Sequence, residues 1–138
     1  IVSRDGNYLL NIGPKGDGSI PSRTVKSLTE LGKWTQLYGE CIYGATRSPF
    51  ATEPQWGYYT KKEGKLFVAI TDWPSEGYIV IPILKNNITN VYELTNKSSK
   101  LQYVVEKDGV KIILPSKAAN DLCSVICVET EGGGVSGE

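Results

Sequence analysis

The 138-residue chain has the composition of a folded globular protein, with 40% apolar and 22% charged residues, which excludes a disordered or collagen-like chain. Lysine plus arginine (15) balance aspartate plus glutamate (15), so no excess positive charge is available for a polyanion, and we expect no nucleic-acid partner. The absence of histidine removes the commonest general base, the usual partner of a serine or cysteine nucleophile, and the favourite zinc ligand.

A short apolar run near the start of the chain predicts a buried strand. Residues Asn7–Ile12 (NYLLNI) are stopped by Gly13-Pro14, and this length with these flanks favours a strand inside a parallel sheet over a helix. Together with the loop and the helix predicted after it, this strand would form half of a βαβ unit. A parallel strand needs neighbouring strands, and the rest of the chain supplies none. The first residues, IVS, also read like the middle of a sequence, and we expect an internal start.

The segment Ser22–Tyr38 predicts a helix with a signal at each end. Ser19 or Ser22 can supply the N-cap oxygen, Pro21 suits the first turn, and Gly39 can take the left-handed conformation that closes the helix. Apolar and polar residues then segregate at helical spacing. The side expected to be buried comprises Thr24, Leu28, Leu31, Trp34, Thr35 and Tyr38, and the opposite side carries Lys26, Glu30 and Lys33.

The character of the sequence changes near residues 44–54, which predicts a domain boundary. Short β-branched and aromatic runs separated by turn signals follow, as is typical of an antiparallel two-sheet β-sandwich. The chain is therefore predicted to be mainly β, with a strand-loop-helix unit over residues 1–44 and a sandwich over residues 45–130. The predicted strands are Trp56–Lys61, Lys65–Thr71, Tyr78–Ile81, Val91–Leu94, Leu101–Glu106, Val110–Leu114 and Ser124–Glu129.

Two turns and the end of the chain complete the prediction. Glu63-Gly64 and Asp108-Gly109 fit tight hairpins that need positive φ. The last residues, EGGGVSGE, have almost nothing to bury, so residues 131–138 are expected to be a disordered tail or the remnant of an expression tag.

The three cysteines favour free thiols over a disulfide. Cys123 and Cys127 lie four residues apart in a predicted strand, on one face and about 13 Å from each other, which is too far for a disulfide. Cys41 could pair with one of them, but cysteine is among the most buried residue types, and buried free thiols are favoured. No run approaches the roughly 18 apolar residues of a membrane span, so we expect no membrane partner.

Three blocks taken together resemble the closing section of the α-L-fucosidases of glycoside hydrolase family 29. They are IVSRDGNYLLNIGPKGDGSIP, LTELGKWTQLYGECIYGA and WGYYTKKEGKLFVAITDWPSEGYIVIP. The resemblance extends over almost the whole chain. The resemblance implies that residues 1–44 are the last strand and helix of a (β/α) barrel and that the remainder is the family's carboxyl-terminal sandwich. It also implies a parent enzyme that hydrolyses the bond to terminal α-L-fucose with retention of configuration and needs no cofactor. Enzymes of this family are usually secreted, periplasmic or lysosomal.

The resemblance assigns no catalytic residue to this chain. In the family, the aspartate nucleophile, the glutamate acid/base and the sugar-binding histidines come from earlier barrel strands, which are missing here. Weak candidates for lining the sugar pocket of a complete barrel remain at the carboxyl end of the predicted strand and in the loop after it, where barrel enzymes build their sites. These candidates are Asn11, Gly13, Pro14 and Lys15. A simpler interpretation of Asn11 is that its amide hydrogen-bonds the loop backbone.

Other side chains have plainer explanations than function. The carboxylates nearest the barrel-like part show no pairing of the kind that acid/base chemistry needs. They are Asp5, Asp17, Glu40 and Glu53, and Asp17 between two glycines fits a turn. A group of aromatic residues could stack on sugars, but strand alternation favours core packing. This group comprises Trp56, Tyr58, Tyr59, Trp73 and Tyr78.

Two hypotheses follow. The first is a catalytically silent fucosidase fragment whose sandwich braces the missing barrel, with the strand and helix packing on that sandwich or on another copy of the chain; fucosylated glycans would be bound through the parent enzyme. The alternative is a stand-alone carbohydrate-binding or partner-binding sandwich. Exposed aromatic residues would favour the alternative.

Overall fold

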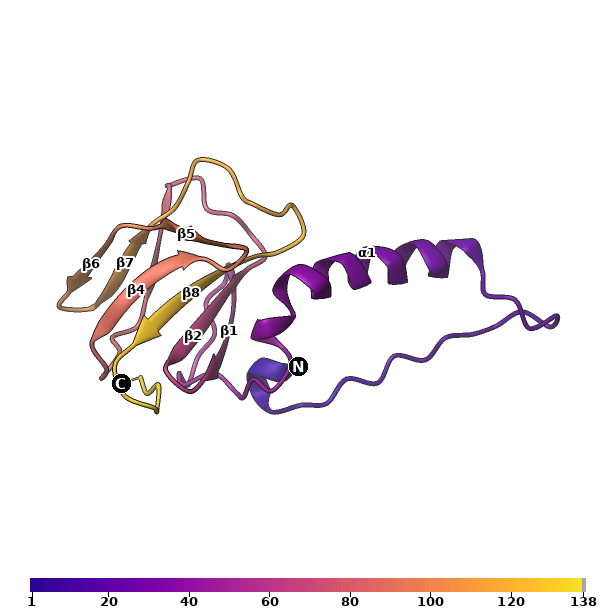
Figure 1. Ribbon diagram of the computed structural model, residues 1–138, viewed down its shortest axis with the longest axis horizontal. Coiled ribbons are helices and arrows are strands. Elements are labelled where there is room, and N and C mark those ends of the chain that lie inside the picture. Colours follow the sequence, from indigo (N-terminus) through magenta and orange to yellow (C-terminus); the bar gives the residue numbers. More distant parts are fainter. Residues whose placement is uncertain (138) are drawn as a thin grey trace.

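The computed structural model describes residues 1–137 and consists of a β-sandwich from which one long helix projects (Figure 1). Its sheets contain five and three strands, and every strand pair is antiparallel. The expected fold class, mainly β with two antiparallel sheets and one helix, is confirmed.

The five-stranded sheet has the order β1-β2-β8-β4-β5 and the three-stranded sheet the order β3-β7-β6. The large sheet is built from β1 (Gly57–Lys62), β2 (Lys65–Ile70), β8 (Ser124–Thr130), β4 (Ile88–Glu93) and β5 (Asn96–Lys100). The small sheet is built from β3 (Tyr78–Ile81), β7 (Gly109–Ile113) and β6 (Tyr103–Glu106). Seven of these strands correspond to predicted runs. β5 was not predicted because its sequence, NKSSK, has no apolar residue.

The main core lies between the two sheets. Inward-facing residues of alternating strand positions form it, including Leu66 and Val68 of β2, Ile126 of β8 and Ile112 of β7. The central strands β2 and β8 are buried along nearly their whole length rather than at alternate positions. Both faces of the large sheet are therefore covered: the inner face by the small sheet, the outer face by a second cluster described below.

Helix α1 spans Ser22–Tyr38, as predicted, but its ends differ from the prediction. Pro21 is the N-cap residue, and no side chain caps the helix there. Gly39 keeps a right-handed conformation (φ −56°) because the chain continues into a 3-10 helix, η2 (Gly39–Cys41). A second 3-10 helix, η1 (Val2–Arg4), begins the chain.

Residues 7–12 correct the prediction of a buried strand. They run as an extended, exposed segment beside α1 and join no sheet (Figure 1). Leu9 is the extreme case, with 86% of its surface exposed. The physical reason is the missing neighbours: a parallel strand is stable only between partners, and this chain contains no other parallel strand among its described residues.

The two predicted hairpins form, for two different reasons. Gly64 connects β1 to β2 with φ +67°, which is the left-handed conformation that favours glycine. Gly109 does not have positive φ and instead permits close packing, because a Cβ atom there would lie 2.6 Å from the Ile81 carbonyl oxygen. The hairpin at Asp108-Gly109 was therefore predicted correctly, but the positive φ that was expected there is absent.

The described part of the carboxyl-terminal tail packs on the sandwich, in contrast to the expected disorder. Val135 is fully buried in the main core, and Gly137 forms an isolated antiparallel β-bridge with Leu84. The Lys61 ammonium donates to the Val135 carbonyl over 3.0 Å, and the Lys85 amide donates to the Ser136 carbonyl over 3.0 Å. One valine and several backbone hydrogen bonds are enough to hold a segment that composition alone suggests is loose.

Candidate functional site

The most distinctive site in the chain is the junction between helix α1 and the outer face of the large sheet. A second apolar group, which we call the outer cluster, fills this junction. It contains Tyr38, Cys41, Phe67, Tyr92, Leu94, Val125 and Cys127. Trp34 packs against it and stacks on Tyr38, with ring centroids 5.3 Å apart. The carboxyl-terminal end of the helix is thereby built into the sandwich.

Three polar contacts surround the outer cluster. The Trp34 indole donates to the Cys123 carbonyl over 2.8 Å, and the Thr60 hydroxyl donates to the Cys41 carbonyl over 2.7 Å. The Lys65 ammonium lies 2.6 Å from the Glu40 carboxylate, and this hydrogen bond lowers the pKa of Glu40. Each contact joins the helix end or η2 to a strand, or to the loop before β8. The orientation of α1 is therefore fixed by specific bonds as well as by apolar packing.

A carboxylate lies buried beside Tyr38. Burial, and then the neighbouring Glu93, raise the pKa of the Tyr38 hydroxyl to about 12. One oxygen of Glu93 accepts hydrogen bonds from the backbone amide and the hydroxyl of Thr95. The other oxygen has no hydrogen-bond partner among the described residues.

The cysteines gather in or beside the outer cluster as free thiols. Burial raises the pKa of Cys41 to about 12 and that of Cys123 and Cys127 to about 11. The thiolate is the reactive form, so these thiols are poor nucleophiles at neutral pH.

The opposite half of α1 has no such cover. A shallow groove of about 220 Å³ runs between it and the extended segment, lined by Leu10, Asn11, Ile12, Arg23, Thr24, Ser27 and Leu28. Of the residues predicted to be buried along this side, Leu31 remains exposed, and Thr24 and Leu28 are only half-buried. We call residues 22–31 the uncovered half of α1.

The four candidate pocket residues do not converge. Asn11 contributes to the groove, whereas Gly13, Pro14 and Lys15 lie in the exposed loop beyond it. The Lys15 backbone accepts from the Gly18 amide and donates to the Ser19 carbonyl, which shapes the loop. The expected bond from the Asn11 amide to loop backbone is not present among the described residues.

Each candidate carboxylate has a structural contact. Asp17 accepts from the amide and hydroxyl of Ser19, which lowers its pKa and confirms it as a turn residue. Asp5 accepts from the Arg47 amide, and Glu53 accepts from the Tyr59 amide. None of these groups faces another carboxylate in the way that glycoside hydrolysis requires.

The aromatic residues divide between core and surface. Tyr59 is buried and contacts Trp56 edge-to-face, while Trp73 packs partly against the main core. Tyr58 and Tyr78 are exposed, with the Lys111 ammonium 3.9 Å from the Tyr78 ring centroid. Core packing therefore explains three of the five, and the exposed two lie on different sheets.

The described residues form neither a metal site nor a membrane-spanning helix. No group of three or more acidic or cysteine side chains within residues 1–137 could hold a metal ion. In the same range, the helices are too short or too polar to cross a bilayer.

The junction was not predicted as a site, although the sequence contains a signal for it. β2 and β8 read LFVAI and SVICV, without the alternation of a strand that has one face in water. Such runs indicate cover on both faces, and α1, the only α-helix among the described residues, is the element available for the outer face.

Comparison with known proteins agrees with this two-part architecture. The family model for alpha-L-fucosidase matches residues 1–40, and that for the alpha-L-fucosidase C-terminal domain matches residues 49–127. The chain belongs to the alpha-L-fucosidase family. The boundary between the two matches falls between helix α1 and the first strand of the sandwich. The junction therefore connects the part matched by the first model to the part matched by the second.

Named relatives are enzymes several times longer than this chain. An alpha-L-fucosidase from Branchiostoma floridae is 30% identical over 124 residues, which are 88% of this chain and 28% of that protein. The structure of alpha-L-fucosidase isoenzyme 1 from Paenibacillus thiaminolyticus matches 94% of this chain and 32% of its own, with 29% identity and a TM-score of 0.83. The alpha-L-fucosidase from Vibrio sp. strain EJY3 matches 99% of this chain, with 28% identity and a TM-score of 0.83. The chain therefore corresponds to the carboxyl-terminal part of an alpha-L-fucosidase.

Proposed function

We propose that this chain is the structural, catalytically silent part of an alpha-L-fucosidase, which holds the last barrel helix in place for an upstream catalytic barrel. In the complete enzyme, that barrel would hydrolyse terminal α-L-fucose with retention and would supply both catalytic carboxylates. The sandwich would position α1, and through it the extended segment, against the barrel.

The observation that carries the proposal is the unequal cover of α1. Its carboxyl-terminal end is packed in the outer cluster. In its uncovered half, Val25 and Leu31 are exposed, and Leu28 lies in the groove beside Leu10 and Ile12. An exposed apolar surface of this kind indicates an interaction partner. A barrel lacking its last strand and helix has the complementary need, because its sheet and its helix layer are both open at that point.

The silent role is tested by incubating the purified chain with an aryl α-L-fucoside. We expect no release of the aryl group, because the candidate carboxylates have structural contacts and no facing partner. Turnover that disappears when Asp5, Asp17, Glu40 or Glu53 is replaced by the corresponding amide would overturn the proposal.

The bracing role is tested in a chimera. The 138-residue chain replaces the matching carboxyl-terminal part of the Paenibacillus enzyme, on which it superposes closely. In an active chimera, Leu28→Lys should abolish activity because it puts a charge into the barrel-facing groove. Val80→Lys, on the outer face of the small sheet, is the control and should leave activity unchanged. Equal effects of the two substitutions would contradict the proposed role.

A further inference from the structure

Two of the four edge strands of the sandwich, β5 and β6, differ in their protection against pairing with a further strand. β5 is the edge of the large sheet and carries Lys97 and Lys100, which oppose pairing with another strand. β6 is the edge of the small sheet and presents Val104 and Val105, which are 52% and 62% exposed. An apolar edge strand with no charge at its centre is a template for an additional strand.

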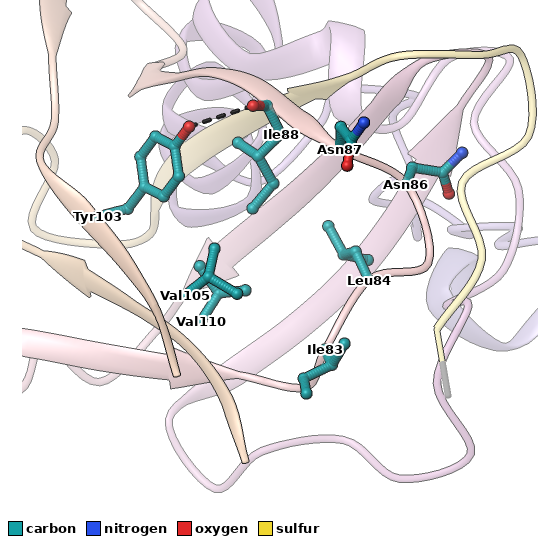
Figure 2. Close-up of a pocket in the computed structure, with 8 residues that line it drawn as sticks. All are labelled: Ile83, Leu84, Asn86, Asn87, Ile88, Tyr103, Val105 and Val110. Atoms are coloured by element: carbon teal, nitrogen blue, oxygen red, sulfur yellow. Dashed lines mark hydrogen bonds between the residues drawn. The ribbon is translucent and has the colours of Figure 1, made fainter. Parts of the chain in front are cut away.

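A groove lies directly beside the β6 edge, between the two sheets (Figure 2). It has a volume of about 350 Å³ and is lined mainly by aliphatic side chains, among them Val105, Val110, Ile88 and Leu84. The Tyr103 hydroxyl donates to the Ile88 carbonyl over 3.1 Å and so connects the sheets next to the groove. A strand added to β6 would place every second side chain in this groove, because strand side chains alternate between faces.

The chain itself contains a segment with the matching property. Residues 7–12 are extended and apolar, and within the described chain they make no backbone hydrogen bond. Tyr8, Leu10 and Ile12 alternate along one side of an extended chain. Their length is sufficient to pair with the whole of β6, which has four residues.

Pairing within one molecule is excluded by distance, because the segment and β6 lie at opposite ends of the molecule (Figure 1). We propose that, without an upstream barrel, this chain associates with a second copy by strand addition: residues 7–12 of one copy pair with the free edge of β6 in the other. Main-chain hydrogen bonds supply the affinity, and the groove selects an apolar side chain. One such contact leaves the segment of one copy and the β6 edge of the other free. The two copies close into a dimer only if a two-fold axis relates them, so that each supplies its segment to the β6 edge of the other.

The test is sedimentation velocity of the chain over a wide range of concentrations. We expect concentration-dependent association of the unaltered chain. Val105→Lys and Leu10→Lys should each weaken association by more than about tenfold, since each buries a charge in the groove or at its entrance. Val80→Lys, a valine of the same sheet on the opposite face, is the matched control and should associate normally.

A mixing experiment separates strand addition from any general apolar contact. The Val105→Lys variant retains an intact segment, and the Leu10→Lys variant retains an intact β6 edge. Each should be monomeric alone, and an equimolar mixture should form a heterodimer. A monomeric unaltered chain, association that survives both lysine substitutions, or a mixture that stays monomeric would each overturn the proposal. None of these results depends on fucosidase activity, so they leave the proposed function to its own tests.

Discussion

The two ends of helix α1 have opposite surroundings. Residues 34–38 reach the outer cluster, where Tyr38 is almost completely buried, whereas residues 22–31 project from the sandwich with Val25 and Leu31 exposed. Isolated helices of this length are marginal in water, and most helical stability in proteins comes from packing of one apolar face. The sandwich supplies this packing for the carboxyl-terminal end of α1 only.

The same contrast separates the strands of the sandwich from residues 7–12, which were predicted to be a strand. The eight antiparallel strands find their partners within the sandwich, while residues 7–12 remain unpaired. A segment that is apolar enough for a core therefore stays in solvent when the elements that would cover it are not in the chain.

The largest expected effect is at the covered end of the helix. Tyr38→Ala removes a buried aromatic ring from the outer cluster and should lower the free energy of unfolding by about 3 kcal/mol. Leu37→Ala, one residue away and 56% exposed, should change it by less than about 0.5 kcal/mol. Urea denaturation followed by circular dichroism measures both. Similar losses for the two variants would show that the outer cluster does not determine the stability of this junction.

A smaller effect is expected at the carboxyl-terminal tail. Val135→Ala removes two methyl groups from the main core and should lower the free energy of unfolding by about 1.5 kcal/mol. Val104→Ala on the exposed edge is the matched control and should have almost no effect. Thermal unfolding of both variants checks this, and an unchanged midpoint for Val135→Ala would support the disorder expected from the tail's composition.

The smallest effect is expected at the Glu40–Lys65 ion pair. The pair is partly solvated, so screening limits its contribution to less than about 1 kcal/mol. Because the hydrogen bond from Lys65 lowers the pKa of Glu40 in the folded state, the contribution is fully present above the ordinary pKa of glutamate. It is lost as the pH falls through the lowered pKa.

Glu40→Gln should therefore destabilise the chain slightly at neutral pH, and the difference should disappear in acid. Denaturant unfolding of the variant and the unaltered chain at several pH values measures it. Glu106→Gln, at an exposed position, is the control. A difference that stays constant with pH would mean that the carboxylate charge does not stabilise the helix end.

Local signals predicted the sandwich well, because its elements are defined by nearby residues. Most of its strands are β-branched or aromatic runs bounded by turns, and helix α1 begins and ends at the expected residues. β5 has no apolar residue, so only its position after the β4 turn makes it a strand. The tail is similar, because burial of Val135 depends on a space left by distant strands.

The junction and the state of residues 7–12 depend on what is present elsewhere in the chain. NYLLNI has the composition of a core strand, but composition cannot show whether partner strands exist. Trp34 and Tyr38 are placed one helical turn apart, yet their partners Cys123 and Phe67 come from distant parts of the sequence. The candidate pocket residues remain a prediction, since Asn11 and Lys15 could meet a sugar only beside further barrel strands.

Hydrogen exchange along α1 tests the central claim most directly. Backbone amides in residues 34–38 should exchange more slowly than those in residues 25–29, because opening the covered end requires loss of the outer cluster. In the chimera with a complete barrel, the amides of residues 25–29 should become protected as well. Uniform exchange along the helix in the isolated chain, or an uncovered half that stays unprotected in an active chimera, would contradict the account.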